Sequence, residues 1–225
     1  MSGRRSLHIG DNLSRLTAYH STMRRTRRVS LLCFLGLLHW VASAACSEAE
    51  RDRWLQPDRV MKAVGVERGM TVGEIGAGRG YFTVKLARAV GPTGRVFAND
   101  IDSGALQDLS DRCKTEDLHN VETVLGTRED PMLPDRALDI VFMVYAFHDI
   151  EPRVALLGNL VPSIRTGATV VVLDEDPEVT GDAHFLETGS IVRYFRLAGF
   201  ERVPAEDFLE RDVLLVFRVV PGATP

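Results

Sequence analysis

Short apolar runs alternate with segments of helical period from about residue 50 to residue 220. The runs that we expect to form strands are 71–75, 95–99, 120–125, 138–144, 168–173, 201–204 and 213–220. The segments of helical period are 50–64, 81–90, 103–114, 152–164 and 186–198. Strands and helices that alternate in this way predict an α/β fold in which one sheet of seven strands has helices on both faces.

Several residue types mark where these elements begin and end. Residues 91–94 read GPTG, and this composition suits a turn better than any regular element. Pro57 interrupts the first helix, Ser103 is the expected N-cap of the third, and Gly199 follows the last as a C-terminal signal. The region contains no internal repeat or low-complexity stretch. We therefore expect residues 50–220 to form one domain.

Residues 1–45 differ in character from the rest of the chain. Met23–Arg28 is strongly basic, residues 29–38 form an apolar run, and Ala42–Ala44 is a small-residue cleavage site. These are the three parts of a secretory signal peptide. We predict an N-terminal extension with a signal peptide or anchor. The residues that lead up to Cys46, together with this cysteine, resemble a lipoprotein box. The protein is then exported, periplasmic or attached to a membrane through this segment, and it is cytoplasmic if the leader is not functional.

Charge is also distributed unevenly along the chain. The chain has 27 basic and 31 acidic residues, and residues 1–45 hold seven arginines and one aspartate, which leaves 20 basic and 30 acidic residues beyond them. An acidic body repels nucleic acid unless it has a local basic groove, and no lysine or arginine cluster occurs there. We expect a small-molecule substrate and no nucleic-acid partner. The sequence does not indicate an oligomeric state.

A glycine-rich loop, Glu74–Gly80 (EIGAGRG), follows the first expected strand. Glycine permits positive φ angles and lets a ligand lie against the backbone, and the N-terminus of the next helix offers free N–H groups to an anion. A dinucleotide fingerprint reads G-x-G-x-x-G, whereas these glycines alternate and follow an acid. Asp100 ends the second strand, where its carboxylate can accept both hydroxyls of a ribose.

Loop, acid and topology together resemble the class I S-adenosyl-L-methionine (SAM)-dependent methyltransferases over residues 51–220. The most specific stretches are 53–57 (RWLQP), 72–82 (VGEIGAGRGYF) and 94–102 (GRVFANDID). The chain looks most like an exported bacterial subgroup of methyltransferase-domain proteins. The resemblance implies a seven-stranded Rossmann-like sheet, SAM as cofactor, and transfer of its methyl group to an unidentified, small-molecule acceptor.

The resemblance also implies which residues bind the cofactor. Carried onto this sequence, they are Glu74, Gly76, Ala77, Gly78, Gly80, Asp100, Ile101 and Thr127. The residues of the loop would flank the methionyl part, Asp100 would hold the ribose, and Ile101 would lie near the adenine. Thr127 stands where family members often have an acid that meets the adenine amino group, and Glu129 or Asp130 could substitute for it.

The acceptor is expected to meet SAM beyond the fourth and fifth strands, because ligands of open α/β sheets bind outside the carboxyl ends of the strands. Residues 145–151 and 174–191 should build this side. His148 is the candidate general base, since an imidazole can accept a proton near neutral pH; packing or helix capping is the competing interpretation. Asp149, Asp174, Asp176 and His184 could collect a divalent metal, but we predict solvated loop acids and no metal.

Two other classes of protein compete with a methyltransferase. One is a SAM-binding module without catalysis, which the intact glycine loop and Asp100 disfavour. The other is a nicotinamide-dependent oxidoreductase, which the glycine spacing disfavours. Binding of SAM or of NAD separates these hypotheses.

Overall fold

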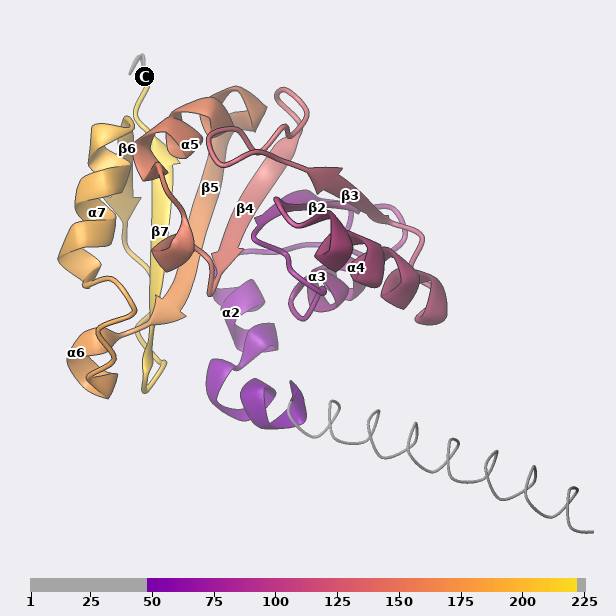
Figure 1. Ribbon diagram of the computed structural model, residues 1–225, viewed down its shortest axis with the longest axis horizontal. Coiled ribbons are helices and arrows are strands. Elements are labelled where there is room, and N and C mark those ends of the chain that lie inside the picture. The colour runs from indigo at the N-terminus through magenta and orange to yellow at the C-terminus, as the bar shows by residue number, and fades with distance from the viewer. Residues whose placement is uncertain (1–47, 222–225) are drawn as a thin grey trace, which may run out of the picture. The chain divides into compact units, whose positions relative to one another are not determined.

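The computed structural model describes residues 48–221, and the compact unit that begins at Arg51 contains one seven-stranded sheet. The strands are β1 Thr71–Ile75, β2 Arg95–Asp100, β3 Val121–Leu125, β4 Leu138–Val144, β5 Ile164–Glu175, β6 Phe200–Val203 and β7 Asp212–Val219. Their order is β3-β2-β1-β4-β5-β7-β6. Strands β1 to β5 pair in parallel, whereas β7 is antiparallel to both neighbours. Figure 1 shows the arrows of β4 and β5 pointing opposite to that of β7.

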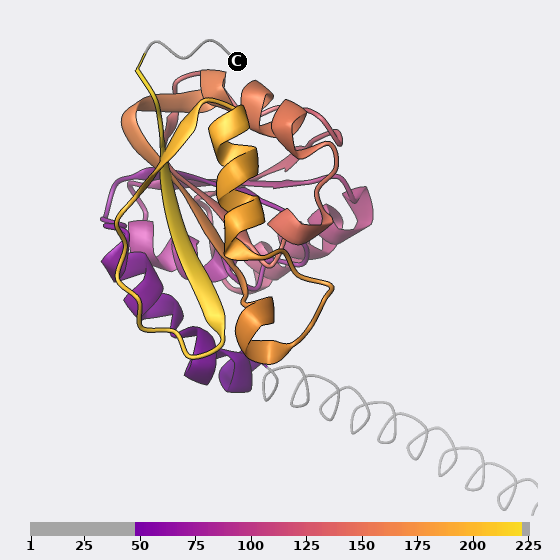
Figure 2. The same ribbon diagram turned by 90° about the vertical axis from the view of Figure 1, so that its left-hand side faces the viewer.

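Helices pack on both faces of this sheet, which confirms the predicted fold class. They are α2 Pro57–Ala63, α3 Thr83–Val90, α4 Ser103–Thr115, α5 Arg153–Leu160, α6 Pro177–Thr180 and α7 Thr188–Leu197, with 3-10 turns at Phe147–Asp149 and Val161–Ser163. In Figure 2, α7 runs alongside β7 in front of the sheet. The short helix α6 and both 3-10 turns were not expected from the sequence.

Predicted boundaries are wrong in three elements. The N-cap of α4 is Asp102, whose carboxylate accepts hydrogen bonds from the N–H groups of Gly104 and Ala105. The helix expected over 152–164 ends at Leu160, because Pro162 has no N–H for a further helical hydrogen bond. Strand β5 begins at 164 rather than 168 and continues to 175, because its last residues pair with β7.

Alternation along the strands divides the apolar side chains between two faces. On one face, Val141 and Met143 pack in a cluster with residues of α5 and α7. On the other face, Ile140 and Phe142 pack with residues of α2 and α3. A smaller cluster, which includes Leu109, joins α4 to β2. Burial on both faces holds the central strands rigidly, so their carboxyl ends form a fixed edge.

The carboxyl ends of the parallel strands β1, β2, β4 and β5 meet at one edge of the sheet. In Figure 1 the arrowheads of β4 and β5 mark its lower side. Strand β7 runs the other way, so its first residue, Asp212, lies at this same edge, paired with Glu175. The edge therefore collects polar side chains from both ends of the domain sequence.

The predicted leader, residues 1–45, lies outside the described residues. Within residues 48–221, none of the helices has the length and apolar character that crossing a membrane requires.

Candidate active site

The glycine loop is fixed by the strands beside it. The N–H groups of Gly76 and Ala77 both donate to the Asn99 carbonyl at 2.9 Å. A Cβ on Gly76 would lie 2.4 Å from Cβ of Ala146, and one on Gly80 would lie 2.2 Å from Cδ1 of Leu109. Both glycines also have positive φ angles, 76° and 84°. Packing and backbone conformation alike therefore require glycine at these two positions.

The middle glycine, Gly78, has a different environment. Its φ is 52°, and a Cβ added there would meet no atom within 4 Å. Its N–H donates to Oδ2 of Asp100 at 2.8 Å, while Oδ1 accepts from the N–H of Asp102 at 2.9 Å. An ionised carboxylate has about four lone-pair sites. Asp100 thus anchors the loop and keeps acceptor capacity for the two hydroxyls of a ribose.

A cavity of about 300 Å³ opens at this edge of the sheet. Its lining is Ile75, Gly76, Asn99, Asp100, Ile101, Thr127, Arg128, Tyr145, Ala146, Asp149, Ile150, Glu151 and Leu156. Of the predicted cofactor-binding residues, Gly76, Asp100, Ile101 and Thr127 belong to this lining. The structure brings these four together, and their contacts with a cofactor remain predictions.

The other four predicted residues, Glu74, Ala77, Gly78 and Gly80, are not among the lining residues. Ala77 is buried in the cluster under α4. Glu74 is also buried, and it accepts a hydrogen bond of 2.5 Å from the hydroxyl of Thr83 at the start of α3. Burial raises the pKa of Glu74 to about 8, against the opposing effect of that hydrogen bond and with a smaller contribution from Asp100. Glu74 therefore supports the loop from beneath.

Thr127 holds the turn that follows β3. Its hydroxyl oxygen accepts from the N–H of Asp130 at 3.0 Å and from that of Glu129 at 3.3 Å. Neither acid lines the cavity, whereas Thr127 and Arg128 do. Thr127, which was expected to lie near the adenine, therefore faces the cavity. The two acids considered as its substitutes, Glu129 and Asp130, do not.

His148 lies on the acceptor side, in the 3-10 turn after β4. Its Nδ1 is 2.8 and 3.0 Å from the two oxygens of Asp174, which is almost completely buried. Burial alone lowers the pKa of His148, but the hydrogen bond to Asp174 and the charges of Asp174 and Asp149 outweigh it, so the pKa lies above its ordinary value near 6.5. The turn after β4 and the carboxyl end of β5 therefore meet at this pair.

Two residues of a polar group at the same edge, Arg211 and Asp212, were missed from the sequence. The hydroxyl of Tyr145 donates to Asp212, and the rings of Tyr145 and Trp54 are 5.9 Å apart between centroids. The guanidinium of Arg211 lies 4.7 Å from the Trp54 ring and bonds Glu175 at 2.5 Å. Burial raises the pKa of the Asp212 carboxyl to about 6, more than the Tyr145 hydrogen bond lowers it. If the last strand had been recognised as antiparallel, its first residue, Asp212, would have been expected at this edge.

Comparison with known proteins agrees with this geometry. Residues 72–167 match a family model described as "Methyltransferase domain", a span that covers the glycine loop, Asp100 and His148. Sheet order, glycine loop and family match together make this region similar to the class I SAM-dependent methyltransferases.

Particular relatives are more distant. A demethylmenaquinone methyltransferase of Geobacillus sp. is 27% identical over 114 residues, 51% of this chain and 49% of the relative. The chain spans about half the length of the curated relatives it matches. A SAM-dependent methyltransferase from Aquifex aeolicus superposes with a TM-score of 0.71 at 22% identity, covering 76% of this chain and 93% of that one. Geranyl diphosphate C-methyltransferase from Streptomyces coelicolor A3(2) gives 0.63 at 13%, covering 76% and 82%. These structures share the fold.

Proposed function

We propose that this chain catalyses transfer of the methyl group of SAM to a small-molecule acceptor. The observation that carries the proposal is the position of Asp100, which holds the N–H of Gly78 and lines the cavity at the edge of the sheet. When bound, SAM supplies a methyl group that its sulfonium already activates. The chain has to bind this donor, orient the acceptor and exclude water.

The donor-side residues fit these tasks. Asp100 would accept the ribose hydroxyls, and the half-exposed Ile101 would cover one face of the adenine. Gly78 leaves its side of the loop open, so a ligand can lie against the backbone. Thr127 would lie at the adenine edge, as the sequence predicts.

On the acceptor side, Tyr145, Ala146, Ile150 and Leu156 give the cavity a mixed polar and apolar wall. A partly enclosed cavity of about 300 Å³ suits a small molecule. Positioning of two reactants can by itself lower a barrier by about 7–11 kcal/mol. Orientation by this wall is therefore sufficient to account for much of the rate.

His148 is proposed as a general base for the acceptor proton. Asp174 occupies Nδ1, so Nε2 is the ring nitrogen left for this role. We predict that His148→Ala lowers kcat by about 10²–10⁴-fold, the usual range for lost general base catalysis, with unchanged SAM affinity. Single-turnover rates and SAM titrations measure the two quantities. A fall in kcat of less than about fivefold would mean that positioning of the reactants, and not a general base, accounts for catalysis. A loss of SAM affinity would mean that His148 belongs to the donor side of the site.

The comparisons suggest where to begin with acceptors. Several curated relatives of this chain are named demethylmenaquinone methyltransferases, and the similarity covers about half of their length. We propose a quinol of this kind as the first compound in a screen, beside smaller phenols and amines. Formation of S-adenosylhomocysteine and mass spectrometry of the product identify the acceptor.

Equilibrium binding of SAM and NAD to the folded protein is the decisive first experiment. SAM binding with product formation supports the proposal. SAM binding without turnover on any acceptor would favour a binding module without catalysis. Preference for NAD would overturn the assignment.

A further inference from the structure

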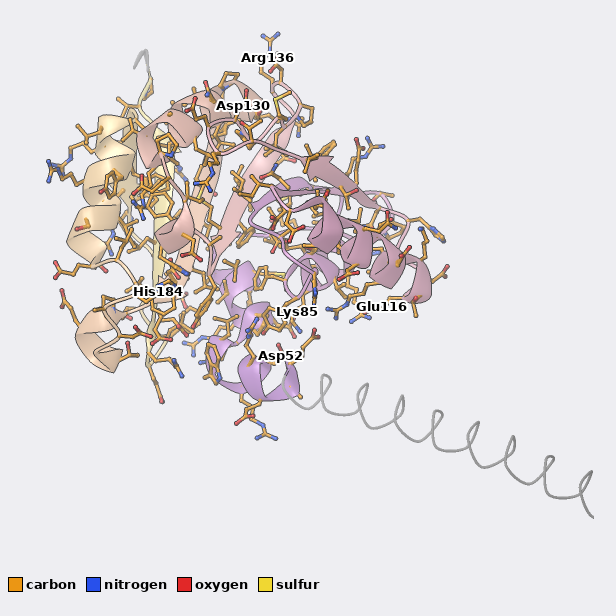
Figure 3. The ribbon with its side chains drawn as sticks, viewed as in Figure 1. Asp52, Lys85, Glu116, Asp130, Arg136 and His184 are labelled. Carbon is orange, nitrogen blue, oxygen red and sulfur yellow. The ribbon has the colours of Figure 1, made fainter. Side chains whose placement is uncertain are left out.

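Three potential metal ligands lie together beside the cavity, and of these the methyl transfer proposed above uses only His148. They are Nε2 of His148, the carboxylate of Asp149, and Nε2 of His184, which is labelled in Figure 3 on the segment between α6 and α7. We propose that these three residues bind a divalent transition-metal ion. The set differs from the one considered in the sequence, because Asp176 instead caps α6 and Asp174 faces Nδ1 of His148.

The separations suit one ion. Nε2 of His148 is 3.4 Å from Oδ2 of Asp149, and Nε2 of His184 is 3.6 Å from Oδ1. Ligands that bind an ion at about 2.0–2.2 Å lie roughly 3–3.6 Å from one another. The ligand atoms all lie within 4.8 Å of one another. Asp149 and His184 have side chains 69% and 60% exposed, so they are free to rotate by the small amount that closure needs.

A second observation is the orientation of His148. Its side chain is only 6% exposed, and its Nδ1 faces both oxygens of Asp174 at 2.8 and 3.0 Å. A ligating histidine typically donates its other ring N–H to a carboxylate, which fixes the tautomer and the ring. Asp174 therefore places a proton on Nδ1 and presents the lone pair of Nε2 to the ion. The ring of Phe185, 4.4 Å away between centroids, limits movement of the imidazole.

The ligand types indicate the class of ion. Imidazole nitrogens suit zinc, iron, nickel and copper, whereas magnesium and calcium prefer oxygen ligands alone. Two histidines and one carboxylate therefore favour an ion such as Zn²⁺ or Co²⁺. Three protein ligands leave at least one coordination position for water or for an oxygen of another molecule. Asp149 also lines the cavity, so the ion would lie at the border of the proposed acceptor space.

Metal binding goes beyond the proposed methyl transfer and can be tested without it. An ion on Nε2 and a proton accepted by Nε2 exclude each other. In the metal-bound protein, His148 is therefore a ligand and not the general base.

The test is titration of the full-length protein with CoCl₂, followed by visible absorption, and with ZnCl₂ in a calorimeter. We expect the wild type to bind one ion at this site with a visible Co²⁺ band. His184→Ala and Asp149→Asn should weaken binding by at least about 100-fold, and Asp174→Asn by about 10- to 100-fold, the range for groups that orient a ligand. Because the side chains of His184 and Asp149 are exposed, their replacement should leave the domain folded, and circular dichroism checks this.

The matched control is His119→Ala. Within residues 48–221, His119 is an exposed histidine 2.9 Å from Asp117 and belongs to no group of three potential metal ligands, so its removal should leave the titration unchanged. Equal binding by wild type, His184→Ala and Asp149→Asn would overturn the proposal, because other groups of the chain would then account for the signal. SAM affinity, measured on the metal-free protein, tests the proposed function separately.

Discussion

At the scale of single residues, Asp100 has two roles that one carboxylate can fulfil together. Each oxygen already accepts a backbone N–H, one from the glycine loop and one from the residue that caps α4. The loop is thus held in a binding conformation by the protein itself. A ligand that binds there loses less conformational freedom than it would by ordering a mobile loop.

Replacement of Asp100 tests this arrangement. Asp100→Ala should weaken SAM binding by roughly 10- to 100-fold, because a hydrogen bond to a charged group contributes about 1.5–3 kcal/mol. Calorimetric titration measures the affinity. Asp108→Ala removes an exposed carboxylate paired with Arg79 and serves as the charge-matched control. Equal affinity in both variants would take Asp100 out of the donor site.

Gly78 and Gly65 provide a matched pair for the loop. Both have positive φ, 52° and 79°, and neither has an atom within 4 Å of an added Cβ. Valine at either position strains the backbone, but only at 78 would it also block a ligand. Gly78→Val should abolish SAM binding while Gly65→Val retains it, with similar losses of thermal stability. Normal binding by Gly78→Val would limit the glycine to a role in the turn.

The buried Glu74 predicts a dependence of stability on pH. Its pKa is about 8 in the folded protein and ordinarily near 4.5. A carboxyl with a raised folded pKa stabilises the fold fully below pH 4.5, and this contribution is lost as the pH rises through about 8. Glu74→Gln cannot ionise, so its unfolding free energy should exceed that of the wild type by an amount that grows as the pH rises over this range.

Urea denaturation at several pH values measures this difference. Glu201→Gln removes an exposed carboxyl from β6 and should leave the pH dependence of the wild type intact. A constant difference between Glu74→Gln and wild type across the range would mean that Glu74 is ionised in the folded protein.

At the scale of elements, hydrophobic patterning located all seven strands, because strands buried on both faces form apolar runs that few other structures require. Boundaries were less well predicted where side-chain hydrogen bonds or strand pairing decide them. Ser103 and Asp102 are both good N-cap types, and only the structure shows which carries the non-helical φ and ψ. Asp174 and Glu175 were expected in a loop, but pairing with β7 extends β5 over them.

The cap of α4 can be tested directly. Asp102→Ala should lower the unfolding free energy by about 0.5–2 kcal/mol, since two N–H groups lose their acceptor. Ser103→Ala, one residue on, should change it little because its side chain makes no capping bond. Chemical denaturation compares the two, and a larger loss in Ser103→Ala would restore the assignment made from the sequence.

At the scale of the whole molecule, the donor side of the site was predictable and much of the acceptor side was not. The glycine loop and Asp100 are close in sequence and joined by one parallel crossover, so topology alone brings them together. Asp212 and Phe185 reach the acceptor side through an antiparallel strand and an irregular segment. No local pattern encodes those approaches, because they depend on the packing of elements far apart in the chain.

The position of β7 has a consequence for how the protein is made. This strand is the last of the seven in the sequence, yet it lies between β5 and β6 and contributes the fully buried Phe217 to the core. While the ribosome is still translating, β5 has no neighbour on that side and β6 has no partner at all. The nascent domain must therefore wait with an open edge until residue 219 has left the exit tunnel. During that interval the unpaired edge of β5 is able to pair with another chain.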